Sequence, residues 1–343
     1  MKKQIAVVGT GLIGRRHAQA IRSSSSASLA RLVDPSADVH EMASAFGVPF
    51  SSSLDELLAI GGVDGVVLST PNEFHVAQAL QCIEAGVPVL VEKPLAVDVA
   101  GARRIVDASE QADVPVLVGH HRRHNPIVSG AFDRIQKGEI GRITAVHATT
   151  WFYKPDDYFN ASWRSQPGAG PIYINLIHDV DMLRHLCGEV SHVQAMESSG
   201  VRNSDVEDTA VILLRFANGA LGTMSVSDCT VSPWSWELTS AENPAYPKTD
   251  ELCLMIGGTL GSLTLPDVSL WHYSDERSWW KPINERRHSV PVADPLVEQI
   301  EQFARVIEGV EAPLVSARDG MLNQRVLDAI KQSSRERTMI AIE

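Results

Sequence analysis

A short apolar run that leads directly into a glycine-rich turn constrains the fold of this chain more than any other feature. Ile5-Ala6-Val7-Val8 ends at Gly9-Thr10-Gly11-Leu12-Ile13-Gly14, and helical periodicity follows over 15–21. In such a strand-turn-helix unit the first glycine permits the tight turn, the second leaves room for a pyrophosphate, and the third lets helix and strand pack closely. The pattern therefore predicts an α/β unit that binds a dinucleotide, with a purely structural glycine turn as the alternative.

An acidic residue at the end of the next predicted strand strengthens this interpretation. The strand covers 29–33 and ends at Asp34, 20 residues after Gly14. A carboxylate at this place accepts hydrogen bonds from the ribose diol of a bound adenosine and repels a 2′-phosphate. The sequence therefore favours NAD over NADP as the cofactor.

Strands and helices continue to alternate through the first third of the chain. Further strands are predicted over 63–69, 87–91 and 115–119, with helices over 73–85 and 98–111. This alternation is typical of a doubly wound parallel sheet, the Rossmann arrangement. We expect an NAD-binding domain over 1–121 and a second domain over 122–343.

Two of the predicted strands end in polar turns at the edge of the sheet where ligands bind. One turn is Thr70-Pro71-Asn72 and the other is Glu92-Lys93-Pro94. The crevice beyond the carboxyl ends of parallel strands is the usual ligand site of open α/β sheets. Lys93 is therefore a candidate acid or base. His75, one turn into the following helix, has two possible roles, facing the cleft or solvating the helix end.

The second half of the chain has the period-2 alternation of β-structure without intervening helices. Strands are predicted over 143–150, 190–197, 209–216, 220–231, 252–256 and 262–265, and helices over 126–138, 296–308 and 318–334. Many consecutive alternating strands indicate a mainly antiparallel sheet with helices covering one face.

Composition narrows the class of partner. The formal net charge is −12, from 42 acidic and 30 basic residues, and no apolar run reaches the length of a membrane span. A broad contact with nucleic acid or with a membrane is not expected, whereas a small molecule is. The four cysteines have no close pair, which fits a reducing cytoplasm. His120, His121 and His124 lack the spacing and acidic neighbours of a metal site, so no metal is predicted.

Three of these motifs together resemble one family. Gly9 to Gly14, Thr70-Pro71-Asn72 with His75, and Glu92-Lys93-Pro94 are similar in kind and order to the glucose-fructose oxidoreductase, inositol dehydrogenase and rhizopine-catabolism (Gfo/Idh/MocA) family. The resemblance implies an NAD-dependent oxidoreductase acting on an alcohol. The positions expected to bind the cofactor are Gly9, Gly11, Leu12, Ile13, Gly14, Asp34, Thr70, Pro71, Asn72, His75, Glu92, Lys93 and His121.

The resemblance continues into a second signature with one departure. Trp163-Arg164, the turn Gly168-Ala169-Gly170-Pro171 and a helical run with His178 match the family, which implies Lys93 and His178 as catalytic residues. Polyol-oxidising members have an aspartate four residues before this histidine. Here the position is Ile174, and the nearest polar residue is Asn175. Inositol specificity is therefore less well supported than redox chemistry.

The resemblance also implies a polyhydroxylated substrate and an oligomer. The substrate classes that fit are a sugar, a polyol, a sugar acid or a cyclic hydroxy acid, with a homodimer or homotetramer formed through the second sheet. Substrate contacts are expected from Arg123, Tyr153, Trp163, Arg164 and Asn175, although the aromatic residues also suit an ordinary core. Two alternatives remain open, a glycoside-processing enzyme that oxidises its substrate transiently and an NAD-binding regulator without catalysis.

Overall fold

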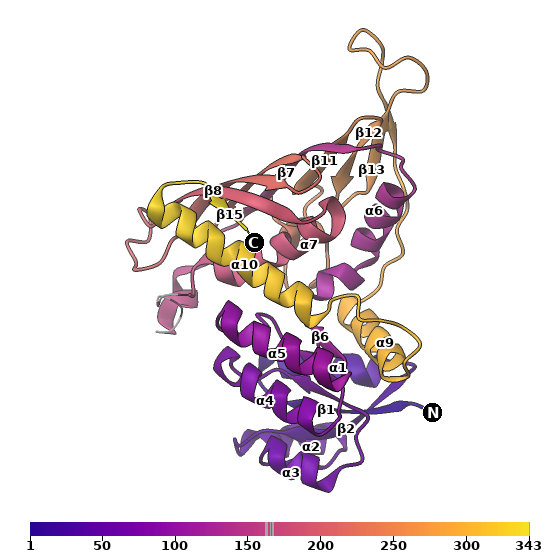
Figure 1. The fold of residues 1–343 in the computed structure, drawn as a ribbon, viewed down its shortest axis with the longest axis vertical. Coiled ribbons are helices and arrows are strands. Elements are labelled where there is room, and N and C mark those ends of the chain that lie inside the picture. Colours follow the sequence, from indigo (N-terminus) through magenta and orange to yellow (C-terminus); the bar gives the residue numbers. More distant parts are fainter. Residues whose placement is uncertain (162–163, 165, 167, 343) are drawn as a thin grey trace. The chain divides into compact units, whose positions relative to one another are not determined.

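The chain divides into two compact units (Figure 1). The computed structural model describes residues 1–161, 164, 166 and 168–342. Unit 1 comprises Met1–His124 and Ala293–Gln324, and unit 2 comprises Asn125–Val292 and Arg325–Glu343. Each unit has a sheet and a hydrophobic core of its own.

Unit 1 contains a six-stranded sheet in the order β3-β2-β1-β4-β5-β6, with all pairings parallel. The strands are β1 (Lys3–Val8), β2 (Ala27–Val33), β3 (Phe50–Ser51), β4 (Gly65–Leu68), β5 (Val89–Val91) and β6 (Val116–Val118). Between them lie α1 (Leu12–Ser23), α2 (Asp38–Phe46), α3 (Leu54–Ile60), α4 (Asn72–Glu84) and α5 (Val99–Ala112). The strand order reverses between β1 and β4, where doubly wound folds bind their ligands. The predicted Rossmann sheet is confirmed.

The central strand β1 shows why its sequence is a continuous apolar run. Successive side chains of a strand point to opposite faces of the sheet. Ile5 and Val7 belong to the core on one face, and Ala6 and Val8 belong to the core on the other. A strand that is covered on both faces has no solvent-exposed side, so its sequence does not alternate between apolar and polar residues.

The last part of unit 1 comes from far along the chain, which differs from the predicted boundary of 1–121 and 122–343. Helix α9 (Pro295–Ile307) places Leu296, Ile300 and Phe303 in the same core as Ile5 and Val7. The 3-10 helix η1 (His121–His124) also lies in unit 1. An amphipathic helix shows in its sequence that one face is buried, but not which sheet it covers, so this return to unit 1 could not be predicted.

Unit 2 contains a nine-stranded sheet in the order β14-β13-β12-β11-β7-β10-β9-β8-β15. The strands are β7 (Ile143–Trp151), β8 (Val190–Ser198), β9 (Thr209–Phe216), β10 (Leu221–Ser227), β11 (Leu254–Gly258), β12 (Gly261–Leu265), β13 (Ser269–His272), β14 (Asn284–Arg286) and β15 (Ile340–Ala341). Only the pairing of β7 with β10 is parallel among these strands. The mainly antiparallel sheet is therefore confirmed, and the three strands missed by the sequence are short.

Helices cover one face of this sheet (Figure 1). They are α6 (Pro126–Gln136), α7 (Ile177–Cys187) and the second part of α10 (Ala317–Glu336), whose buried side chains share one core with those of β8, β9 and β10. Shorter elements are η2 (Asp156–Asn160), the π-helical turn η4 (Ile172–Leu176) and α8 (Trp236–Thr239). No helix in the described part of the chain is long and apolar enough to cross a membrane.

Candidate functional site

The glycine turn of unit 1 has the backbone geometry expected from its sequence. Gly9 has a φ of +89°, and a Cβ on it would lie 2.6 Å from the carbonyl oxygen of Ser69. A Cβ on Gly14 would overlap the carbonyl oxygen of Gly9. The reasons given above for these two glycines, a tight turn and close packing, are confirmed.

The start of α1 fits the phosphates of a dinucleotide. A Cβ on Gly11 would meet no heavy atom within 4 Å. Gly11 caps α1 without any side-chain hydrogen bond, and Leu12 beside it is 86% exposed. The first amide groups of a helix need acceptors, and an anion is a favourable one because of the helix dipole. The open space at Gly11 and the uncapped helix therefore suit the pyrophosphate of NAD.

Asp34 is fixed next to this turn. Its Oδ2 accepts hydrogen bonds from the Thr10 amide at 2.7 Å and the Thr10 hydroxyl at 2.9 Å, and its Oδ1 accepts from the Ser36 amide at 2.9 Å. These donors orient the carboxylate without using all of its acceptor positions. An oriented carboxylate with remaining acceptor positions, beside the glycine turn, is what the predicted contact of Asp34 with a ribose diol requires.

His75 joins the two polar turns from inside unit 1. Its Nε2 lies 2.9 Å from the carbonyl oxygen of Thr70, and its Nδ1 lies 2.8 Å from that of Pro94. The ring is fully buried, and burial lowers its pKa although both carbonyls favour the protonated form. Of the two roles left open by the sequence, neither is realised, since the ring faces neither solvent nor an open cleft. It holds the Thr70-Pro71-Asn72 turn against the turn that contains Lys93.

Glu92 places a carboxylate in the interior of unit 1. Its Oε1 lies 2.6 Å from Nε2 of His17 on α1, and its Oε2 accepts a hydrogen bond from the Lys93 amide at 3.0 Å. Glu92 is 6% exposed and His17 is fully buried. A Cβ on Gly119, just after β6, would lie 2.9 Å from the carboxylate, so that glycine leaves room for it.

The charge of Glu92 is maintained by its surroundings. Burial alone raises the pKa of a carboxyl group, because it penalises the ionised form. The hydrogen bond and charge of His17, together with the charges of Lys93 and His121, outweigh burial and lower the pKa of Glu92 to about 2. Glu92 is therefore an ionised side chain that orders the backbone at Lys93 rather than one that faces solvent.

Lys93 follows Glu92 directly and is partly exposed. Its peptide bond to Pro94 is cis. His121 on η1 is also partly exposed, whereas Arg123 is 5% exposed and donates hydrogen bonds to the carbonyl oxygen of Leu314 and to Asp319, each at 3.2 Å. Arg123 is thus bound within unit 1, which makes a supporting role for it better founded than the predicted substrate contact.

In unit 2, Asn175 lies in η4 and His178 lies in the first turn of α7. Both are partly exposed, whereas Leu176 and Ile177 between them are buried. The turn that contains Asn175 is π-helical, a form that is rare and often found at functional sites. Ile174 has no ionisable group, so the carboxylate that the family resemblance implies for polyol oxidation is absent at that position.

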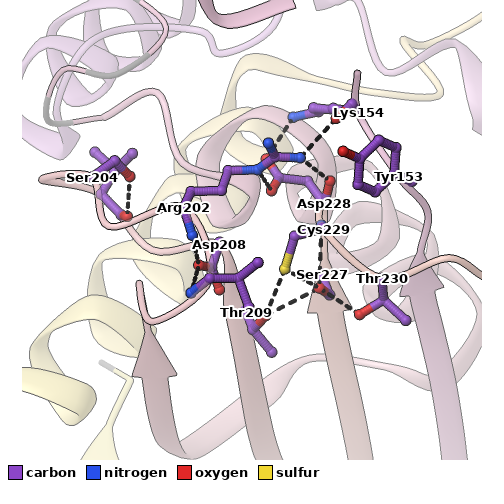
Figure 2. Close-up of polar contacts among 12 residues, drawn as sticks. Tyr153, Lys154, Arg202, Ser204, Asp208, Thr209, Ser227, Asp228, Cys229 and Thr230 are labelled. Carbon is purple, nitrogen blue, oxygen red and sulfur yellow. Dashed lines mark hydrogen bonds and ion pairs between the residues drawn. The ribbon is translucent and has the colours of Figure 1, made fainter. Parts of the chain in front are cut away.

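A buried lysine binds Asn175. Nζ of Lys154 donates a hydrogen bond to Oδ1 of Asn175 at 2.9 Å and pairs with Asp228 at 3.3 Å. Figure 2 shows Arg202 reaching the same aspartate, with its Nε 2.9 Å from Oδ1. Burial lowers the pKa of Lys154, and the charge of Arg202 acts in the same direction, while Asp228 and Glu237 oppose it.

Two other predicted substrate residues of unit 2, Tyr153 and Arg164, lie around this cluster. Tyr153 is 50% exposed, and its ring centre lies 5.6 Å from the guanidinium carbon of Arg202. Arg164 donates a hydrogen bond to the carbonyl oxygen of Tyr158 at 2.6 Å and stacks on that ring at 3.9 Å. Trp163 lies outside the described residues.

Sequence reasoning missed the partners that orient these residues. His17, Lys154 and Asp228 belong to no recognisable motif, and each meets its partner only in the folded chain. A buried charge needs a partner, but a sequence does not show which charges are buried. Among the described residues, no group of three or more His, Cys, Asp or Glu side chains is arranged to hold a metal ion.

Comparisons with known proteins bear on both units. The model of an oxidoreductase family with an NAD-binding Rossmann fold, GFO/IDH/MocA, matches residues 3–120, and the model of the GFO/IDH/MocA C-terminal domain matches residues 130–264.

Three relatives illustrate the range of similar proteins. Myo-inositol 2-dehydrogenase of Thermotoga maritima is 25% identical, over 99% of this chain and 98% of its own. The 4-carboxy-2-hydroxymuconate-6-semialdehyde dehydrogenase of a Sphingobium strain is 28% identical over 65% of this chain and 71% of its own. The WlbA dehydrogenase of Bordetella pertussis, solved in complex with NADH and UDP-GlcNAcA, is 28% identical, with a TM-score of 0.79 over 100% of this chain and 99% of its own.

The buried pair of Glu92 and His17 leads to a prediction about stability and pH. The pKa of Glu92 lies below its ordinary value of 4.5, so the ionised carboxylate stabilises the fold above that pH, and the stabilisation is lost as the pH falls from 4.5 towards 2. The shift corresponds to about 3 kcal/mol. We expect Glu92→Gln to lower the free energy of unfolding at pH 7 by roughly that amount, and to flatten its decline between pH 5 and pH 3.

Urea unfolding at several pH values measures both effects. Glu110→Gln is the matched control, since the Glu110 side chain is 59% exposed, and its pH profile should follow the wild type. Parallel profiles for Glu92→Gln and the wild type would show that Glu92 is not ionised in the way described.

Proposed function

The chain belongs to the GFO/IDH/MocA family of NAD-dependent oxidoreductases, and we propose that it transfers a hydride between NAD and a secondary alcohol of a sugar, polyol, sugar acid or cyclic hydroxy acid. The observation that carries this proposal is the uncapped start of α1, with open space at Gly11 and the oriented carboxylate of Asp34 beside it. The relatives point to the same kind of substrate, since one is named for myo-inositol and another was solved with UDP-GlcNAcA.

In this proposal the residues of unit 1 hold the cofactor. The amides at the start of α1 bind the pyrophosphate, and Asp34 accepts hydrogen bonds from the adenosine ribose. Thr70, Pro71, Asn72 and His121 would hold the nicotinamide half. Bound NAD supplies the hydride acceptor, which no amino-acid side chain provides.

Lys93 and His178 are the proposed catalytic residues. Oxidation of an alcohol needs a group that takes the hydroxyl proton and a second group that hydrogen-bonds the same oxygen. A lysine and a histidine supply these two functions, and either order of roles satisfies the chemistry. Glu92 fixes the backbone amide of Lys93 at 3.0 Å, which limits the positions from which its side chain extends. Tyr153, Trp163, Arg164 and Asn175 are proposed to bind the substrate.

We also propose that the protein forms a homo-oligomer through the sheet of unit 2. The face of this sheet opposite the core presents apolar side chains that are about half exposed or more, namely Met196, Val211, Leu213, Leu221 and Met255. A shallow hollow of about 880 Å³ lies over the same strands. An apolar face of this kind is unusual for a monomer. A second copy of the same sheet offers a self-complementary apolar surface, as a two-fold interface requires.

A panel of sugars, polyols and their acids tests the proposed activity. The wild type should accumulate NADH in proportion to the substrate oxidised by at least one class of compound. Lys93→Met should lower kcat by about 10²–10⁴-fold, the usual contribution of general acid–base catalysis, and should change the Kd for NADH far less than it changes kcat. NADH formation and calorimetric NADH binding are measured separately.

Three outcomes would contradict the proposal. Near-normal turnover by Lys93→Met would show that Lys93 is not a catalytic residue. Conversion of a glycoside without accumulation of NADH would favour transient oxidation of the substrate. NAD binding with no turnover of any compound in the panel would favour a regulator.

The proposed oligomer predicts that a charge on the apolar face lowers the association state. Leu213 is 54% exposed in the middle of β9, and Leu213→Glu buries a carboxylate wherever two such faces meet. Sedimentation velocity should show the wild type as a dimer or larger and this variant shifted towards monomer. Val310→Glu, at a residue 70% exposed in unit 1, is the control and should sediment like the wild type. A wild type that sediments as a monomer would refute the proposal.

A further inference from the structure

We propose that Lys154 is a positioning residue that fixes the carboxamide of Asn175 with its NH2 group towards the substrate, so that this part of the site selects an acceptor oxygen, above all the carboxylate of a sugar acid. The inference rests on the proposed function, because it assumes that Asn175 meets the substrate. It goes beyond that function by assigning a role to a residue outside the family motifs and by choosing among the substrate classes.

The position of Lys154 is closely defined within unit 2. Its side chain is 9% exposed, and its Nζ lies 2.9 Å from Oδ1 of Asn175 and 3.3 Å from Asp228. The rings of Tyr158 and Phe152 have their centres 4.9 Å and 5.6 Å from the same nitrogen. An ammonium group surrounded in this way by an amide oxygen, a carboxylate and two aromatic rings has little freedom to move.

Arg202 fixes the aspartate that binds Lys154. Besides its bond to Asp228 Oδ1, Arg202 donates from Nη2 to the backbone carbonyl oxygens of Lys154 at 2.8 Å and Asp228 at 2.6 Å (Figure 2). The backbone of Arg202 is held in turn, because its amide donates to Asp208 at 3.0 Å. Two neighbouring strand ends and the loop before β9 are thus tied together around the lysine.

Lys154 determines which end of the Asn175 carboxamide faces outward. An ammonium group only donates hydrogen bonds, so the oxygen of the carboxamide must face it and the nitrogen must point elsewhere. Among the described residues, none accepts a hydrogen bond from Nδ2 of Asn175, and the side chain is partly exposed. The accessible end of Asn175 is therefore a donor.

This donor lies on the same segment as His178. The two residues are three positions apart, and both are partly exposed while Leu176 and Ile177 are buried. Asn175 belongs to η4 and His178 to the first turn of α7, so less than one helical turn separates them. A substrate that reaches the imidazole of His178 thus finds the NH2 group of Asn175 beside it.

The hydrogen-bond chain makes this donor suited to a negatively charged acceptor. The ammonium of Lys154 draws electron density from the amide oxygen, which polarises the N–H bonds at the other end, because hydrogen bonds in a chain strengthen one another. Hydrogen bonds to ionised acceptors are the stronger ones. An aspartate at Asn175 would do the opposite, since it would pair with Lys154 and present an acceptor.

Binding of two matched probes tests the inference. D-Glucarate and D-sorbitol have the same four secondary alcohols and differ only at their ends, which are carboxylates in one and hydroxymethyl groups in the other. Since both ends change together, the direction of binding does not matter. The Kd of each probe is measured by calorimetry on the protein saturated with NADH.

The wild type should bind D-glucarate at least about tenfold more tightly than D-sorbitol, the effect of one hydrogen bond to a charged group. Lys154→Met should remove most of this preference, and Lys154→Arg, which keeps a donor, should retain most of it. Asn175→Asp should reverse it. The Kd for NADH should stay unchanged in all three variants.

The controls separate positioning from general stability. Arg134→Met breaks another ion pair of unit 2, between Arg134 and Glu139, and should leave the preference as in the wild type. Asp228 keeps Arg202 as its partner in Lys154→Met, which limits the cost to folding. If that variant nevertheless unfolds, Asn175→Asp decides the question alone.

Equal binding of the two probes by the wild type, binding of neither, or an unchanged preference in Lys154→Met or Asn175→Asp would overturn the inference. Its failure is distinguishable from that of the proposed function. A wild type that prefers D-glucarate but forms no NADH with any compound supports the inference and contradicts the proposed activity. A wild type that forms NADH but binds the two probes equally supports the activity and contradicts the inference.

Discussion

The buried carboxylate of Glu92 is the interaction on which the arrangement of unit 1 around its glycine turn depends. An ionised group inside a protein is costly unless it is paired and hydrogen-bonded. Glu92 meets that requirement with His17 on α1 and with the amide of Lys93 at the end of β5, over the glycine that follows β6. The helix that begins at the glycine turn and the strand end that carries the proposed catalytic lysine are therefore joined by one charge.

Unit 2 also contains a buried carboxylate that orients its neighbours. Asp228 is 2% exposed and holds two cations, Lys154 and Arg202, of which the first binds Asn175. In both units a buried carboxylate determines the direction of a side chain or backbone group that lies nearer the surface. Residue 174 is an isoleucine and supplies no charge, but charged side chains still orient Asn175 in the segment before His178. These side chains come from residues that are distant in sequence.

The sequence predicted the parts of the molecule that have local signals. Gly9 and Gly14 were assigned from their spacing between a predicted strand and a predicted helix, because a tight turn and a close helix contact each require a missing side chain. The strands of unit 1 were predicted from short apolar runs between helices, and the long strands of unit 2 were predicted from their period-2 alternation. The return of Ala293–Gln324 to unit 1 was not, since α9 would be equally amphipathic on either sheet. The sequence did not decide whether His75 faces the cleft or solvates the helix end. Its burial depends on two carbonyl groups that lie next to it only in the folded chain. Lys154 and His17 were missed for the same reason.

A double-mutant cycle between His17 and Lys93 tests most directly whether the buried charge serves catalysis. It is measured as kcat/KM for the compound that the wild type oxidises fastest, using His17→Gln, Lys93→Met and the double variant. Effects of residues that act as one unit are not additive. If His17 acts through Glu92 on Lys93, His17→Gln alone lowers kcat/KM, but adding it to Lys93→Met has little further effect. The Kd for NADH of the His17→Gln variant stays unchanged. Full additivity of the two substitutions would contradict the account.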